Sequence, residues 1–252
     1  MVVLGLVFAL GGAARAGTIS LDDPLVPAGL GDGDTFHLVF VTTTTRDASP
    51  TDIAVYNAFV QAAADGGGSV VAGHGFTWKA IGSTETTNAR DNAVVSAPVY
   101  RLDGVQVATG YADMWSGTIA HPINKDQTGA TRNVEVWTGS TTGGLTEYCD
   151  YSEYGPEYAN YPAYLGGAAD NVRTGLSYAS SEPYSVPAET VNPDTAWINW
   201  DVWYTPRYMA DSYSLYALSE ELEVEGGGAI VPEPASLGLV GLALLAVRRR
   251  RS

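Results

Sequence analysis

The last 22 residues of the chain combine three features that a globular core does not accommodate together. Prolines at positions 232 and 234 fix φ and lack a backbone donor, so the chain is extended there. Residues 235–247 are all apolar or small, and as a helix these 13 residues would span about 20 Å. An arginine cluster, Arg248, Arg249, Arg250 and Arg251, then precedes the last residue. The globular part of the protein must therefore lie before this tail.

The apolar run predicts a C-terminal hydrophobic helix that inserts transiently into a membrane. A hydrocarbon core of about 30 Å requires about 20 helical residues, so the run is short for a permanent span. It becomes long enough only where the arginines snorkel and the bilayer thins. The arginine cluster holds the C-terminus on the cytoplasmic side. An ordinary permanent anchor is the alternative.

The tail resembles the PEP-CTERM sorting signal of Gram-negative bacteria, with Pro232, Glu233 and Pro234 as its sorting motif and the arginine cluster at its end. The resemblance implies an exosortase-type processing enzyme as a partner and cleavage near the Pro-Glu-Pro triplet. It also implies an inner-membrane-tethered intermediate, followed by delivery to the cell surface or the extracellular matrix.

The N-terminal end also predicts export. Residues 2–10 are apolar, and Ala14-Arg15-Ala16 fits the small-x-small pattern of signal-peptide cleavage, although no basic residue precedes the apolar run. We therefore predict a signal peptide over residues 1–16 and a mature chain that begins at Gly17. A buried N-terminal strand is the alternative.

The part between the two ends is strongly acidic. We predict one domain over residues 17–225, a Gly-rich linker over 226–231 and the sorting tail over 232–252. Residues 17–231 carry 8 Lys and Arg against 27 Asp and Glu, a net charge of −19. This charge argues against nucleic acid as a partner. The acidic charge has two alternative interpretations: clustered acids that bind divalent cations, or a solvated acidic surface as in proteins from saline habitats. The presence of only two lysines favours the second interpretation.

The pattern of the domain predicts an α+β fold with mostly short antiparallel strands, long loops and one clear helix. Ser49 as N-cap and Pro50 in the first turn open the helix, and the glycines at 66–68 end it. Its apolar stripe consists of Ile53, Tyr56, Phe59, Val60 and Ala63. Strands are predicted over residues 36–41, 76–81, 134–138, 197–200 and 215–219, with a hairpin over 99–108 that turns at Asp103-Gly104.

The order of these elements resembles the C-type-lectin-like fold, in a bacterial branch related to the endostatin-type domain. The resemblance covers about residues 36–224 and rests on Trp78-Lys79-Ala80, Asn88-Ala89-Arg90-Asp91, the hairpin, Asp113-Met114-Trp115-Ser116-Gly117, Trp197 and residues 215–218. It implies a lectin-like single domain. The paired cysteines common in such domains are reduced to Cys149, which we expect to be a buried small hydrophobe. The Glu-Pro-Asn sugar-binding triplet is absent, so the fold carries over without the sugar site.

Asn199 and Asp201 are the candidates for a Ca²⁺ site. They lie in Trp197-Ile198-Asn199-Trp200-Asp201, which is similar to the Trp-Asn-Asp motif of calcium-dependent lectins with a residue inserted on each side of the asparagine. In a strand, both side chains and Trp197 would share one face. Ca²⁺ takes about six to eight oxygens, and two residues supply few of these. Core tryptophans with a polar rim are therefore the favoured interpretation, and no cofactor is predicted.

Six tyrosines crowd one acidic segment of the chain. Together with Trp197 they are the candidate glycan contacts: Tyr148, Tyr151, Tyr154, Tyr158, Tyr161 and Tyr164. An exposed tyrosine offers an apolar face and a polar tip, which suits stacking on sugar rings. The alternative is a loop that folds over the core and buries these side chains singly.

No catalytic constellation stands out, so we predict that the chain is not an enzyme. His37, His74 and His121 form no metal-spaced pair, and the sequence lacks a Gly-x-Ser-x-Gly elbow, a P-loop and a Cys-x-x-Cys pair. The sequence favours an exported, non-enzymatic surface or matrix protein that is adhesive or associated with exopolysaccharide. A Ca²⁺-dependent carbohydrate-binding module and a secreted polysaccharide hydrolase are the alternatives.

Overall fold

A computed structural model describes residues 17–150, 152, 155–156, 159–167, 172–178, 197–199 and 207–226 of the chain. The predicted signal peptide, the linker after Gly226 and the sorting tail with its hydrophobic helix lie outside these residues, as do Tyr151, Tyr154, Tyr158 and Asp201. Across the described ranges, no helix is long and apolar enough to cross a membrane.

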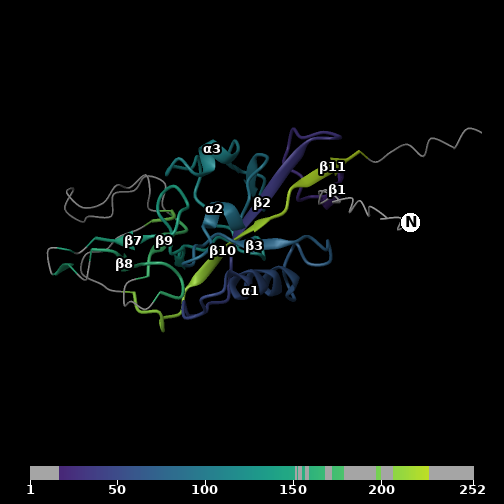
Figure 1. Cartoon of the computed structure of the whole chain (residues 1–252). Helices are drawn as coiled ribbons and strands as arrows, with labels where there is room; N and C mark the ends of the chain where they lie inside the picture. Colours follow the sequence, from purple (N-terminus) through teal and green to yellow (C-terminus); the bar gives the residue numbers. More distant parts are fainter. Residues whose placement is uncertain are drawn as a thin grey trace, which may run out of the picture.

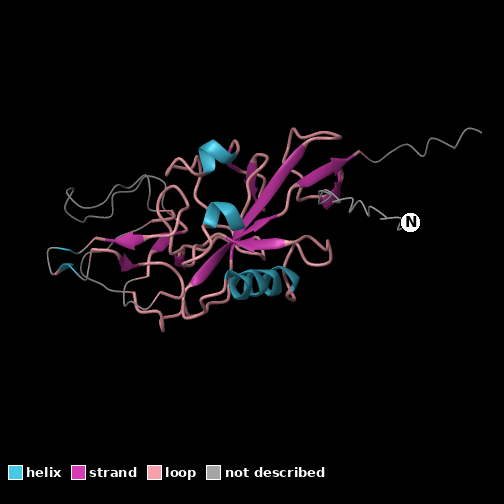
Figure 2. Cartoon of the chain, viewed as in Figure 1, coloured by secondary structure: helices cyan, strands magenta, loops and turns pink. Residues whose placement is uncertain are grey.

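The described residues form short strands and three helices, joined by long loops (Figure 2). The strands are β1 (Gly17–Ser20), β2 (Thr35–Val41), β3 (Trp78–Ala80), β4 (Val99–Arg101), β5 (Gln106–Ala108), β6 (Glu135–Trp137), β7 (Tyr148–Cys149), β8 (Tyr161–Pro162), β9 (Thr174–Leu176), β10 (Ser214–Ser219) and β11 (Leu222–Glu225). The helices are α1 (Ile53–Asp65), α2 (Ala89–Asn92) and α3 (Tyr111–Met114). The predicted α+β class is therefore confirmed.

The centre of the fold is a mixed, nine-stranded sheet. Six of its strands lie side by side in the order β1-β11-β2-β10-β6-β9, while β3 pairs with β10, β4 pairs with β2 and β5 pairs with β4. In this sheet β2 pairs with β10 and β11 in antiparallel and with β4 in parallel, while β10 pairs with β3 in antiparallel and with β6 in parallel. The expectation of mostly antiparallel strands is confirmed, since six of the nine strand pairings among the described residues are antiparallel; the parallel ones are β1 with β11, β2 with β4 and β6 with β10. These parallel pairs join strands that are distant in the sequence, and local patterns do not reveal them.

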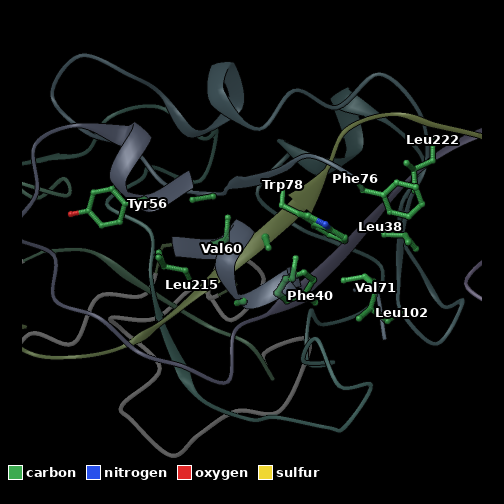
Figure 3. Close-up of a cluster of buried hydrophobic side chains, with 14 of the residues drawn as sticks. Leu38, Phe40, Tyr56, Val60, Val71, Phe76, Trp78, Leu102, Leu215 and Leu222 are labelled. Atoms are coloured by element: carbon green, nitrogen blue, oxygen red, sulfur yellow. The ribbon is translucent and has the colours of Figure 1, made fainter. Parts of the chain in front are cut away.

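Both faces of the sheet are covered, so β2 and β10 are apolar along almost their whole length. Alternate residues of β2, such as Phe36 and Leu38, face the core on the α1 side, while Val39 and Val41 face the core on the other side. The α1-side core also contains Tyr56, Val60, Trp78 and Leu215 (Figure 3). Figure 1 shows α1 on one side of the sheet and α2 and α3 on the other. The single helix expected from the sequence is thus joined by two one-turn helices.

The helix α1 begins three residues later than the sequence predicted. Asp52, not Ser49, is the N-cap, because its Oδ1 accepts a hydrogen bond of 2.9 Å from the backbone N–H of Ala54. The chain from Ser49 to Thr51 is not helical, and the hydroxyl of Tyr56 donates to the carbonyl of Pro50. The helix ends at Gly66, as predicted, and its stripe of Tyr56, Val60 and Ala63 is buried.

Two further predictions have opposite outcomes. The hairpin is confirmed, because β4 and β5 flank a turn in which Gly104 has φ of 78° and the carboxylate of Asp103 accepts from the guanidinium of Arg101 at 2.8 Å. The predicted strand over residues 197–200 is wrong in its described part, since Trp197 and Ile198 form a turn and Asn199 has no regular structure. Thr138 Oγ1 donates to the carbonyl of Ile198 at 2.5 Å, so this backbone carbonyl accepts a hydrogen bond from a side chain.

Candidate functional site

The tyrosine-rich segment forms a short antiparallel pair, β7 and β8, at the end of the molecule away from β1 and β11 (Figure 1). Tyr148 lies opposite Pro162, and Cys149 opposite Tyr161. The pair extends by one bond, since the backbone N–H of Ala163 donates to the carbonyl of Glu147 at 3.1 Å. Cys149 is buried, as expected, so it fixes β7 to the body while its neighbour Tyr148 points outward.

Tyr148 and Tyr164 are in contact, but one side chain is exposed and the other is buried. Tyr148 is 46% exposed, whereas Tyr164 is 6% exposed. Their rings meet edge to face with centroids 5.3 Å apart. Burial raises the pKa of Tyr164, and the neighbouring Glu85 and Tyr148 raise it further. Tyr148 therefore presents an aromatic ring that a buried neighbour holds in place.

The other aromatic candidates separate into core and surface. Tyr161 is half-buried. Trp197 is 1% exposed and packs against Trp115 and Tyr216, with ring centroids 6.2 and 6.1 Å away. The proposed glycan contacts of Tyr164 and Trp197 are thus corrected, because burial removes both rings from the surface; for Trp197 the core interpretation holds.

Acidic side chains border Tyr148. Glu147 precedes it, Asp150 follows the strand, and both Asp150 and Glu85 are exposed. The N–H and hydroxyl of Ser152 lower the pKa of Asp150, which keeps this carboxylate ionised. The surface formed by Tyr148, Glu85, Glu147 and Asp150, with the buried ring of Tyr164 beneath Tyr148, is called the tyrosine surface below. Its chemistry combines one aromatic face with carboxylate acceptors.

Asn199 approaches the tyrosine surface through Glu147. Its Nδ2 donates to Glu147 Oε2 at 3.0 Å, so its amide nitrogen faces the carboxylate. Asp201, its predicted partner for Ca²⁺, lies outside the described residues. Within the described part, no three His, Cys, Asp or Glu side chains lie close enough to hold a metal ion. One amide and one carboxylate supply too few oxygens for Ca²⁺, which takes about six to eight.

A second polar cluster, which the sequence did not reveal, lies where β2, β10 and β11 meet. His37 is buried, and its Nδ1 donates to the carbonyl of Ser219 at 3.0 Å. Its Nε2 accepts from the backbone N–H of Ser96 at 3.1 Å, while the Ser96 hydroxyl donates to Glu221. Burial lowers the pKa of His37, which favours the neutral ring. A histidine within an apolar strand was the available signal that such partners were needed.

The arrangement of this cluster suits a structural role better than nucleophilic catalysis. A nucleophilic serine directs its hydroxyl proton at the imidazole. Here the hydroxyl proton of Ser96 is directed at Glu221, and Nε2 already accepts a backbone N–H. The cluster therefore joins the segment around Ser96 to the junction of β10 and β11.

Comparison with known proteins identifies the tail. The model of the PEP-CTERM protein-sorting motif matches residues 231–252, which confirms the predicted sorting tail. The motif implies an exported protein that is transiently associated with the membrane and processed by an exosortase. No curated protein matches the chain. The match is confined to the tail, so the function of the body is argued from its own residues.

Proposed function

We propose that the exported body is a non-enzymatic cell-surface or matrix protein that contacts extracellular polysaccharide through the tyrosine surface. In this proposal it is a lectin-like α+β domain, and its final place is the surface or matrix of a Gram-negative bacterium. The observation that carries the proposal is the exposed ring of Tyr148 seated on the buried ring of Tyr164.

The geometry of the two rings favours binding because one of them is already ordered. An aromatic face stacks on the apolar face of a sugar ring. Ordering a side chain on binding costs about 0.5–1.5 kcal/mol, and the contact with Tyr164 reduces that cost for Tyr148. The neighbouring carboxylates of Glu147 and Asp150 offer acceptors for sugar hydroxyls.

The charge of this surface favours a neutral polymer. Glu85, Glu147 and Asp150 are acidic, and the body as a whole has a net charge of −19. Such a field repels polysaccharides rich in uronate or sulfate and leaves neutral ones unaffected. The expected ligand class is therefore an uncharged exopolysaccharide.

The position of the surface supports an outward-facing role. The strand β11, which leads to the linker and the sorting tail, lies at the opposite end of the molecule from β7 and β8 (Figure 1). A chain held at a membrane by its tail would present the tyrosine surface away from that membrane.

The test is retention on immobilised neutral exopolysaccharide. We expect Tyr148→Ala to weaken binding by about 1 kcal/mol, roughly fivefold, because one aromatic contact is lost. Tyr148→Phe keeps the ring and should retain most of the binding. Tyr111→Ala is the matched control, since Tyr111 is 47% exposed but lies on α3.

Equal retention by Tyr148→Ala and Tyr111→Ala would refute the proposal. Retention that requires calcium, measured with and without a chelator, would instead indicate a Ca²⁺-dependent binding module. Release of soluble sugar from the polymer would indicate a hydrolase.

A further inference from the structure

The first described strand begins at Gly17, the residue at which the mature chain is predicted to start. Strand β1 runs parallel to β11, with Gly17 opposite Leu222 and Ser20 opposite Glu225. The backbone nitrogen of Gly17 donates to the carbonyl of Glu221 at 3.0 Å. A mature chain that begins at Gly17, as the sequence predicts, would pair with β11 from its first residue.

Gly17 fits closely against two side chains of the C-terminal strands. A Cβ at this position would lie 3.0 Å from Leu222 Cδ2 and 3.1 Å from Glu220 Oε1. Any larger residue would press on both groups. The nitrogen of Gly17 is two bonds, about 2.5 Å, from that position, which places it within about 5.6 Å of Glu220 Oε1.

The carboxylate of Glu220 is held in place independently of β1. The backbone N–H of Thr77 donates to Glu220 Oε1 at 2.9 Å, and the backbone N–H of Glu220 donates to the carbonyl of Thr77 at 2.8 Å. These two bonds orient the side chain toward the edge where β1 begins. A pre-oriented, half-buried carboxylate is a suitable receptor for a cation.

We propose that removal of the signal peptide at the Ala16–Gly17 bond creates an ammonium group that pairs with Glu220 and locks β1 onto β11. Hydrolysis of this bond consumes one water molecule, leaves a carboxylate on Ala16 and an amine on Gly17, and the amine takes up a proton. Before cleavage the same nitrogen is a neutral amide, which donates to Glu221 but carries no charge. An α-amino group has a pKa of about 7.7–8.0, so it is charged below about pH 8.

This pairing would act on the strand that leads to the sorting tail. Strand β11 lies between β1 and β2, and Leu222 pairs with Phe36 on its other side. After β11, the backbone N–H of Gly226 donates to Asp32 Oδ1 at 2.6 Å. Removal of the signal peptide would thereby stabilise the end of β11, the last described strand before the sorting tail. The proposal rests on signal-peptide removal and is independent of polysaccharide binding.

The test compares the same chain before and after cleavage. The full chain is prepared with a specific protease site directly before Gly17, so that cutting leaves Gly17 as the first residue. At pH 6 we expect cutting to raise the melting temperature by about 2–4 °C, the effect of one modest interaction in a domain of this size. At pH 9.5, where the amine is neutral, the rise should disappear.

Two variants identify the partner of the amine. Glu220→Gln keeps an acceptor for Thr77 but removes the charge, so cut and uncut protein should melt alike. Glu223→Gln changes an exposed carboxylate on β11 and should keep the full rise. A rise that persists in Glu220→Gln or at pH 9.5, or no rise in the native sequence, would overturn the proposal.

The exported protein supplies a second measurement. Its mass or N-terminal sequence should show Gly17 as the first residue. A mature chain with a different first residue would also overturn the ion pair, while the Tyr148→Ala comparison would still decide polysaccharide binding.

Discussion

Side chains of the same type are exposed at some positions of this protein and buried at others. Tyr148 is exposed and Tyr164 is buried, although both come from one tyrosine-rich segment. His37 is buried with both ring nitrogens bonded, whereas His121 is exposed and bonds the carbonyl of Gln106. The side chain alone does not decide between surface and core for these amphipathic residues; the surrounding sheet does.

The His37 environment predicts a pH dependence of stability. Well above pH 6.5, the ordinary pKa of histidine, the ring is neutral in both the folded and the unfolded chain. His37 therefore does not make the free energy of unfolding depend on pH there. Below pH 6.5 the unfolded chain takes up a proton that the folded chain resists. The free energy of unfolding should therefore fall on acidification from pH 7 to 5.5, by at most about 1.4 kcal/mol per pH unit.

Urea denaturation at several pH values measures this slope. The backbone of Ser219, the negative charge of Glu221 and the backbone of Glu220 each favour the protonated ring of His37, and together they only partly offset the effect of burial on its pKa. His37→Gln should flatten the slope, and His121→Gln should leave it unchanged. An unchanged slope in His37→Gln would show that another group is responsible.

At the scale of elements, local signals located most of the regular structure. The continuous apolar run of β2, the stripe of α1 and the Asp103-Gly104 turn are all readable within a few residues, and the structure contains each of them. The start of α1 was misplaced because Ser49 and Asp52 both suit an N-cap. Only the backbone geometry shows which of the two oxygens reaches an unpaired N–H.

Substitution at the two candidate caps distinguishes them. Asp52→Ala should lower the free energy of unfolding by about 1 kcal/mol, because the N–H of Ala54 loses its acceptor. Ser49→Ala should change it by less than about 0.5 kcal/mol, since Ser49 is exposed and precedes the helix. Thermal or urea denaturation measures both. A larger loss in Ser49→Ala would contradict the assignment of Asp52.

At the scale of the whole molecule, the covered mixed sheet carries a tyrosine surface at one end and the paired β1 and β11 at the other (Figure 1). The sorting motif matches residues 231–252, after the end of β11 at Glu225. The body and the tail are therefore separate functional parts. The tail implies export, transient association with the membrane and processing by an exosortase.

Processing of the tail gives a prediction for the whole chain. Cleavage near the Pro-Glu-Pro triplet should leave a mature protein that lacks the residues after about Pro234, and with them all four terminal arginines. Intact-mass analysis of protein from an exosortase-bearing native host measures this. Recovery of a chain that still ends at Ser252 would contradict cleavage and favour the permanent anchor.

The sequence by itself determined the export tail, the α+β class, the helix α1 and the β4–β5 hairpin, because each depends on residues close together in the chain. The tertiary structure decided the parallel pairing of β1 with β11, the burial of Trp197 and the exposure of Tyr148 beside Tyr164. Gly17 and Leu222 pair across almost the whole domain, and no local pattern encodes such a partner. The pairing follows from the sheet as a whole, in which each strand is stabilised by the neighbours that cover its edge and its two faces.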